Sequence, residues 1–232
     1  MLAKCKLIVT TSWDDGAATD IKLADLLVKY GIKGTFYVPK SYLNSHLEEA
    51  DIKEIDRFHE IGAHTLNHRD LTKIPINEAR AEIVKNKEYL EDVVGHRIST
   101  FCYPYGRYNQ TIKRIVKQAG FIAARTCEHG ELYEIEDPYE WKITLHASNG
   151  SPVTTIKIWL ESRISIKSLF DWYTRAKLLF NHALKNGGIY HIWGHSHEFI
   201  NLKDWYKLEK LFKYISSRKD VCYLTNRDIF SY

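Results

Sequence analysis

The chain has 232 residues, of which 44% are hydrophobic and 27% are charged, a balance that is ordinary for a soluble globular protein and excludes a disordered chain. A formal net charge of +4 without a dense run of Lys and Arg gives no indication of a nucleic-acid partner. No apolar run reaches the ~18 residues of a membrane-spanning helix, so we expect no membrane span.

The sequence predicts strands and helices that alternate along the chain. The strands are short β-branched or aromatic runs, and the helices have apolar side chains three and four residues apart. In chain order, we expect a strand at residues 7–11, a helix at 20–30, a strand at 34–38, a helix at 51–60, a strand at 61–64, a helix at 76–94, a strand at 100–103, a helix at 109–119, strands at 121–124 and 142–145, a helix at 169–185, a strand at 189–193, a helix at 202–216 and a strand at 221–224.

Alternation of this kind is typical of parallel βαβ units. Seven or eight strands predict an α/β fold, a distorted (β/α) barrel of parallel strands, as a single domain over residues 1–232. An open doubly wound sheet is the alternative, although no glycine-rich dinucleotide-binding turn follows the first strand. Residues 147–168 are the least regular stretch, and we expect an excursion there near the active site.

The four cysteines are scattered and form no CxxC pair, which disfavours a cysteine-bound zinc ion. In a chain of this length we expect Cys5, Cys102, Cys127 and Cys222 to be buried free thiols, with disulfides as the alternative. The N-terminus enters a strand pattern without a signal-peptide pattern before it. We therefore expect a cytoplasmic protein, unless a leader has been removed.

Two adjacent carboxylates, Asp14 and Asp15, follow the first predicted strand in the sequence Ser12-Trp13-Asp14-Asp15-Gly16. Barrel enzymes place their chemistry at the C-terminal ends of their strands. Neighbouring acids repel each other, and a divalent cation would keep both of them ionised. An Asx turn that caps the next helix is the structural alternative.

Two histidines, His64 and His68, are four residues apart at the end of the third predicted strand. On a helical turn both imidazoles would point the same way, and neutral imidazole is a good zinc ligand. The spacing alone is a weak signal, because His191 and His195 share it. The first pair, however, should lie near Asp15, and two imidazoles with one carboxylate leave open positions for water, as in catalytic metal sites.

Two further segments could take part in chemistry. Residues 104–106, Pro-Tyr-Gly, favour a tight turn that could aim a backbone N–H into a cleft and leave Tyr105 on its wall. After the strand at 189–193, His195 could act as an acid or a base, because the unperturbed pKa of histidine lies near neutrality. Taken alone, each segment is more often a structural turn or a surface loop.

Together and in this order, the segments resemble the motifs of the polysaccharide deacetylase family, also called the NodB-homology family or carbohydrate esterase family 4. Residues 12–16 match its first motif and residues 64–68 match its second, H-S/T-x-x-H motif. Residues 104–106 match the third motif, residues 137–141 loosely match the fourth, and the fifth is reached at His195, with His191 and His197 as competitors. The resemblance spans roughly residues 6–225.

The resemblance implies a metal-dependent enzyme. It assigns Asp15, His64 and His68 to a divalent metal, for which we expect Zn²⁺, and it assigns Asp14 to the role of general base. The chemistry agrees with this division, because a bound metal lowers the pKa of its water and the neighbouring carboxylate can take the proton.

The resemblance also implies roles for residues outside the metal cluster. The backbone N–H of Tyr105 would hold the oxyanion, Trp141 of the fourth motif would lie on the substrate side, and His195 would protonate the leaving amine. The third motif departs from the family, because Cys102 stands where the family has an arginine that orients the base. Arg125, at the end of the next strand, could reach in as a substitute, and a surface ion pair is the alternative for it.

We therefore expect a hydrolase that removes N-acetyl groups from amino sugars in a poly- or oligosaccharide or glycoconjugate, with a carbohydrate as the partner. A metal-dependent amidase or deformylase of the same superfamily, acting on a small non-polymeric C–N substrate, is one alternative. An inactive carbohydrate-binding module is another, disfavoured because Asp14 is retained beside all three ligands. The sequence does not determine the acyl group or the oligomeric state.

Overall fold

A single parallel sheet forms the centre of the computed structural model, which describes residues 5–130, 135–148, 171–199 and 202–231. All pairings between its strands are parallel. The strands in the described residues are β1 (Leu7–Asp14), β2 (Gly34–Val38), β3 (Glu60–Ala63), β4 (Thr100–Cys102), β5 (Ala123–His129), β6 (Trp141–Ile143), β7 (Leu145–His146), β8 (Gly188–Gly194) and β9 (Val221–Tyr223).

The sheet closes into a barrel because its two ends are neighbours in the sequence. The strand order is β6-β5-β4-β3-β2-β1-β8-β7, and only Thr144 separates the terminal strands β6 and β7. Thr144 itself donates its backbone N–H to the carbonyl of His191 in β8. β9 lies off this path and pairs with the first residues of β1. The expected distorted (β/α) barrel is therefore confirmed, and the open doubly wound sheet is excluded.

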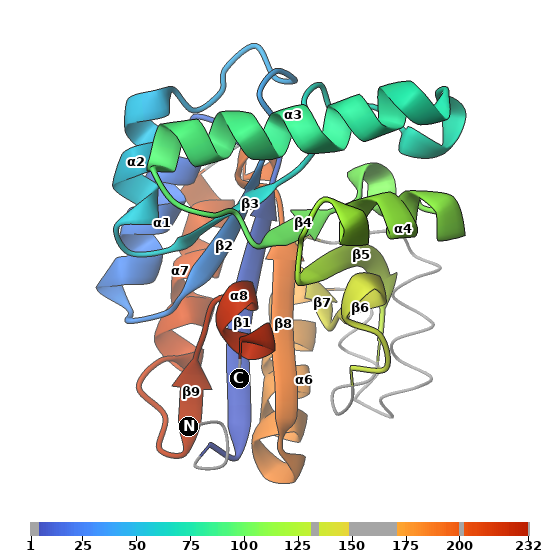
Figure 1. The fold of residues 1–232 in the computed structure, drawn as a ribbon. Helices are drawn as coiled ribbons and strands as arrows, with labels where there is room; N and C mark the ends of the chain where they lie inside the picture. The colour runs from blue at the N-terminus through green and yellow to red at the C-terminus, as the bar shows by residue number, and fades with distance from the viewer. Residues whose placement is uncertain (1–4, 131–134, 149–170, 200–201, 232) are drawn as a thin grey trace.

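Helices cover the outside of the sheet (Figure 1). The described helices are α1 (Asp20–Lys29), α2 (Glu49–Asp56), α3 (Ile76–Val94), α4 (Gln110–Gln118), α6 (Trp172–Asn186), α7 (Leu202–Ile215) and α8 (Asn226–Phe230). Several begin at a side chain that accepts a backbone N–H, as Asn109 and Asp171 do, and α3 ends at Gly95 in the left-handed conformation. The sequence pattern did not predict α8. The order and positions of the other helices agree with that pattern to within a few residues.

Alternation along β1 decides what the barrel interior contains. Leu7, Val9 and Trp13 are fully buried, and the Trp13 ring packs edge-on against Phe199 and against Phe212 of α7. Ile8, Thr10, Ser12 and Asp14 face the opposite side of the sheet, because side chains alternate along a strand. All of these except Ile8 are polar, and Asp14 is the last residue of the strand.

The inward residues of β1 form buried hydrogen bonds in successive layers. Thr10 donates to Asn226 of α8, Ser12 lies 2.8 Å from a ring nitrogen of His191, and Asp14 binds Arg125. α8 lies over β1 in Figure 1, and Asn226 also donates to the Tyr37 hydroxyl. A polar interior that is satisfied in this way is rigid, so it holds Asp14 in a fixed place.

One sequence prediction is wrong, and another concerns residues that the structure does not describe. Cys5 and Cys222 form a disulfide, so the prediction of four free thiols is wrong for this pair; Cys102 and Cys127 are free. The reason is that β9 pairs with the start of β1, with Cys222 opposite Ile8. The irregular stretch expected at 147–168 lies outside the described residues, apart from 147 and 148. None of the described helices is long and apolar enough to cross a membrane.

Candidate active site

The polar residues singled out in the sequence meet at the C-terminal ends of the strands. Asp14 is the last residue of β1, His64 follows β3 directly, Arg125 lies in β5, and His195 follows β8. Tyr105 lies in the 3₁₀ turn η3 (Pro104–Gly106) just after β4. In a parallel barrel these ends share one rim, which is where barrel enzymes place their reacting groups.

Asp15, His64 and His68 form a buried cluster of three possible metal ligands. The Oδ1 atom of Asp15 lies 3.6 Å from Nε2 of His64 and 3.3 Å from Nε2 of His68. Zinc bonds of ~2.0–2.1 Å at tetrahedral angles place neighbouring donor atoms roughly 3.3 Å apart. The spacing of the cluster therefore fits a metal of this kind.

The hydrogen bonds around the cluster also fit a cation. Nδ1 of His64 lies 2.8 Å from the carbonyl oxygen of Cys102, and a proton on Nδ1 leaves Nε2 with a lone pair that faces Asp15. Asp15 Oδ1 is buried without a hydrogen-bond partner in the part of the chain that the structure describes. Burial and the neighbouring His64 lower the pKa of His68 to about 4, so this ring is neutral at pH 7. Lone pairs that converge without protons between them favour a bound cation.

An unusual backbone, rather than a helical turn, brings the two imidazoles together. Six non-glycine residues of the described chain have a positive φ, and four of them lie here: Asp15 (79°), Thr65 (65°), His68 (51°) and Tyr105 (58°). The expectation that both histidines share a helical turn is therefore wrong. Such conformations cost free energy and gather at functional sites, where the surrounding structure holds them.

Asp14 is held from two sides. The guanidinium of the fully buried Arg125 contacts both carboxylate oxygens, and Nε1 of Trp193 donates to Oδ2 at 2.8 Å. Burial alone would raise the pKa of Asp14, but the charge and hydrogen bonds of Arg125, together with nearby histidines, hold this pKa well below its usual range. Asp14 is therefore anionic at neutral pH.

Arg125 reaches the Asp14 carboxylate from the strand next to Cys102. Cys102 in β4 and Arg125 in β5 are register partners in the parallel pair, and the Cys102 sulfur lies 2.8 Å from the guanidinium and 3.5 Å from Asp14 Oδ2. The arginine thus enters the site from the adjacent strand. The alternative of a surface ion pair for Arg125 is wrong, because its side chain is 0% exposed.

The three histidines near β8 have different surroundings. His191 is buried in the barrel, where it contacts Ser12 and the carbonyl of Lys142, and burial lowers its pKa to about 3. His195 and His197 instead face the candidate metal cluster, with Nε2 atoms 3.8 Å and 3.9 Å from Asp15 Oδ2. The geometry separates His191 from the site and leaves two histidines beside it.

Glu198 distinguishes His195 from His197. Glu198 lies in the 3₁₀ turn η6 (Ser196–Glu198), and its Oε1 is 3.1 Å from Nδ1 of His195. Burial would lower the pKa of His195, but the hydrogen bond to Glu198 and the charges of Asp14 and Asp15 raise it. His195 therefore keeps its proton to a higher pH than an ordinary histidine, with Nδ1 toward Glu198 and Nε2 toward the cluster.

Among the residues that the structure describes, two other groups of three donors lie close enough together for a metal. His146 of β7, His195 and Glu198 form one group, in which Nε2 of His146 lies 3.4 Å from Glu198 Oε2. Asp14, His64 and Cys102 form the other, but there the Asp14 carboxylate already binds Arg125.

Two tyrosines form the wall beside His68. The Tyr42 ring stacks on the His68 ring at 4.0 Å, and the Tyr105 ring meets it edge-on at 4.8 Å. Both tyrosines are exposed. They border a cavity of about 540 Å³ whose lining includes His68, so a molecule in this cavity reaches the cluster.

Trp141 has partners inside the barrel. Its ring stacks on His191 at 4.4 Å and meets Phe230 edge-on, and its side chain is buried. Asp137, at the start of the loosely matched fourth motif, caps the 3₁₀ turn η4 (Pro138–Glu140) and binds Lys113. This segment has a structural role, so packing accounts for its sequence.

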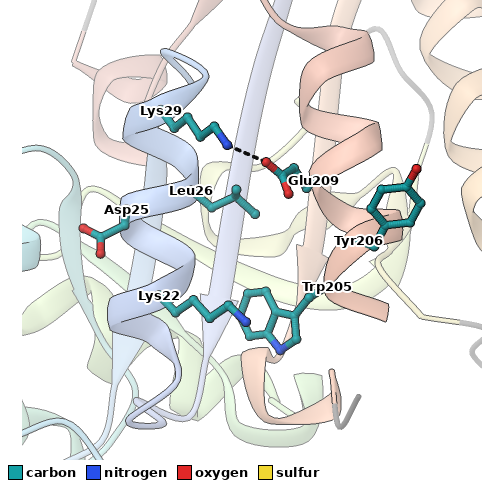
Figure 2. Close-up of a pocket in the computed structure, with 7 residues that line it drawn as sticks. All are labelled: Lys22, Asp25, Leu26, Lys29, Trp205, Tyr206 and Glu209. Atoms are coloured by element: carbon teal, nitrogen blue, oxygen red, sulfur yellow. Dashed lines mark hydrogen bonds and ion pairs between the residues drawn. The ribbon is translucent and has the colours of Figure 1, made fainter. Parts of the chain in front are cut away.

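A second cavity, of about 330 Å³, lies between α1 and α7 (Figure 2). Lys22 of α1 lies over the Trp205 ring of α7 at 4.2 Å, and Lys29 binds Glu209 at 2.6 Å. These contacts join the two helices across the groove, and none of its lining residues belongs to the candidate cluster.

Sequence reasoning missed several of the residues that complete the site. Trp193 was predicted only as part of a strand, although alternation from His191 already placed it on the inner face. Tyr42 follows β2 and Glu198 follows β8, and neither of them is assigned a role from the sequence. Contacts made across strands or loops have no local pattern in the sequence.

The fold and the site define a (β/α) barrel with a candidate metal centre at the C-terminal ends of its strands. The chain belongs to the polysaccharide deacetylase family, because the sequence profile of that family matches residues 3–124. Members of the family are hydrolases that act on carbon–nitrogen bonds other than peptide bonds. The matched region contains Asp14, Asp15, His64 and His68 and ends one residue before Arg125.

Known proteins support this membership. The chain is 29% identical to YxkH of Bacillus subtilis over 153 residues, which are 64% of this chain and 52% of that protein. It is 28% identical to the peptidoglycan-N-acetylmuramic acid deacetylase PdaC of B. subtilis over 137 residues, 58% of this chain and 27% of that protein. The chain therefore spans about half, or less, of these relatives. The chitin deacetylase of Colletotrichum lindemuthianum shares the fold, with a TM-score of 0.63 and 16% identity over 98% of this chain and 90% of that one.

Proposed function

We propose that this chain is a metal-dependent deacetylase that removes N-acetyl groups from amino sugars in a poly- or oligosaccharide or glycoconjugate. The observation that carries the proposal is the buried Asp15–His64–His68 cluster beside the arginine-bound Asp14, open to a cavity that reaches His68. Family membership supports the reaction type. PdaC is a peptidoglycan-N-acetylmuramic acid deacetylase and the Colletotrichum enzyme is a chitin deacetylase, and both names support this substrate class.

Asp15, His64 and His68 would hold the metal, and their mixed nitrogen and oxygen donors suit Zn²⁺. Such an ion supplies a polarised amide carbonyl and a water of lowered pKa. The carbonyl of Cys102 keeps the His64 ring in its ligand orientation. Tyr42 and Tyr105 shield the exposed side of His68.

Asp14 accepts the proton of the attacking water. The low pKa of Asp14 keeps the carboxylate ionised, although it also reduces the driving force for taking a proton. Arg125 and Trp193 hold the carboxylate in one orientation. The side chain is therefore already positioned toward the reacting water and loses no rotamer freedom during the reaction. The backbone N–H of Tyr105 is the proposed donor to the oxyanion of the tetrahedral intermediate.

His195 returns a proton to the amine as the carbon–nitrogen bond breaks. Its Nε2 atom faces the cluster, and Glu198 holds Nδ1 and favours the protonated ring. Without a proton the nitrogen would have to leave as an amide anion, which is a very poor leaving group, so a ring with a raised pKa suits this step. His197 is more exposed and lies on the same side of Asp15.

The experiment is a mass-spectrometric assay of acetate release from N-acetylated oligosaccharides and peptidoglycan fragments. We expect release from at least one N-acetyl sugar, loss of activity after chelation and recovery after Zn²⁺ is added back. Release of formate from N-formyl compounds, without acetate from any sugar of the panel, would instead support a deformylase. Full activity in the His64→Ala and His68→Ala variants would contradict the proposed metal site.

A further inference from the structure

The cavity beside His68 displays positive charge to solvent. Its lining residues are Tyr42, Asn67, His68, Arg69, Asp70, Lys73, Ile74, Tyr105 and Arg107. Three of them are cationic, and the exposed fractions of their side chains are 43% for Arg69, 69% for Lys73 and 55% for Arg107. We call these three residues the basic rim.

The acidic side chains nearby are turned inward or already held. Asp70 is the one carboxylate in the lining; its side chain is 11% exposed and accepts hydrogen bonds from Thr72 and Arg107. Glu82, beneath the cavity, is buried and holds two N–H groups of Asn67.

The rim therefore keeps donors that are free to bind another anion. The Lys73 ammonium lies 3.6 Å from the Asp70 carboxylate, which Arg107 binds at 2.7 Å. Lys73 therefore has the longest ion pair of the three rim residues. Arg69 binds the half-exposed Glu78 through one nitrogen, and a guanidinium has further N–H groups to offer. Arg107 also lies over the Tyr105 ring, which joins the rim to the aromatic wall beside His68.

We propose that this cavity selects an amino-sugar substrate that carries an anionic group, a carboxylate or a phosphate, near the N-acetylated sugar. This inference rests on the proposed function, because it takes His68 as the end of the cavity at which the acetamide lies. A saccharide bound to the tyrosine wall places its substituents against the basic rim. Exposed ion pairs are individually weak, so two or three of them together favour the anionic substrate by roughly five- to tenfold at low salt.

The test compares a substrate with its uncharged copy. One tetrasaccharide of N-acetylated glucosamine carries lactyl ether carboxylates on alternate sugars, and its control has the same groups as carboxamides. We expect kcat/KM for acetate release to be about five- to tenfold higher for the carboxylate, with a ratio that falls toward one at high salt and in Lys73→Glu. A third substrate with 6-phosphates distinguishes phosphate from carboxylate as the preferred anion.

Lys185→Glu is the matched control, because it makes the same charge reversal at a lysine that is exposed in the last turn of α6, where the chain enters β8 at the other end of the barrel. This variant should keep the wild-type ratio. Equal kcat/KM values for the carboxylate and the carboxamide in the wild type would overturn the inference, as would an unchanged ratio in Lys73→Glu.

Calorimetric binding of the same two saccharides separates this inference from the proposed function. Tighter binding of the carboxylate, lost in Lys73→Glu but without any acetate release, would support the basic rim and contradict deacetylation. Acetate release from both saccharides at equal rates, together with equal binding affinities, would support deacetylation and contradict the role of the basic rim.

Discussion

Asp14 and Asp15 are neighbours in the chain but have different partners. Asp14 ends β1 and faces inward to Arg125 and Trp193, whereas the positive φ of Asp15 turns its carboxylate toward His64 and His68. Burial acts to raise the pKa of both carboxyl groups, but the positively charged partners together have the larger effect. The net pKa of each group is therefore lowered. The two residues therefore have separable roles.

We expect Asp14→Asn and Asp15→Asn to fail in different ways. Asp14→Asn keeps the shape of the side chain and loses the proton acceptor, so kcat should fall by about 10²–10⁴-fold while the metal stays bound. Asp15→Asn removes a ligand charge, so metal affinity should fall first. Metal analysis of the purified variants beside the acetate-release assay measures both effects. Metal loss in Asp14→Asn with full retention in Asp15→Asn would reverse the assignment.

At the scale of elements, the segment after β8 brings the proposed acid to the cluster. Gly194 ends β8, and its missing side chain matters because a Cβ there would lie 3.1 Å from the Trp13 ring. The chain then passes His195 and enters η6, where Glu198 folds back onto the imidazole. The Thr19 and Ser196 hydroxyls, 2.6 Å apart, connect this segment to the start of α1. The contact with Glu198, three residues along the chain, thus orients the His195 imidazole.

We expect Glu198→Gln to change the pH dependence of the reaction. The acid must be protonated, so kcat should fall as the pH rises through the pKa of His195, which Glu198 helps to raise. Without that charge the pKa of His195 falls, and the alkaline loss of activity should move to lower pH. A pH–rate profile at saturating substrate measures the shift.

Glu209→Gln is the control for this profile, because Glu209 pairs with Lys29 on the helical surface away from the cluster. Metal content should remain at the wild-type value in both variants. An alkaline limb that stays in place in Glu198→Gln would show that His195 is not the acid, and the same measurement on His197→Gln would then test its neighbour.

At the scale of the whole molecule, closure of the chain depends on contacts between its two ends. The disulfide between Cys5 and Cys222 joins residues 217 apart, and β9 pairs with the first residues of β1 beside it. β9 lies at the end of the barrel opposite α3 in Figure 1. The active-site rim is formed at the other ends of the strands.

We expect reduction of this disulfide to lower the free energy of unfolding by about 2–5 kcal/mol, because the cross-link restricts the unfolded chain. Denaturant unfolding of the wild type with and without reductant, and of Cys5→Ser/Cys222→Ser, measures the loss. Cys127→Ser, which removes a free thiol, should still respond to reductant as the wild type does. Equal stability of the oxidised wild type and the double variant would contradict this expectation.

The sequence by itself determined the alternation of strands and helices, the barrel and the Asp14–Asp15 and His64–His68 pairs at the strand ends. Periodicity and short spacings carry this information, because they act between residues that are near in the chain. The resemblance to known motifs added the roles proposed for these residues.

Only the tertiary structure decided which distant residues meet. Arg125 reaches Asp14 across 111 residues because β4 and β5 pair in one register, and Trp193 arrives from β8 by the same kind of pairing with β1. The histidine pair converges through a backbone of positive φ that the spacing did not indicate, and Cys5 meets Cys222 because β9 lies against β1. Strand register and barrel closure are properties of the whole sheet, and no local pattern in the chain encodes them.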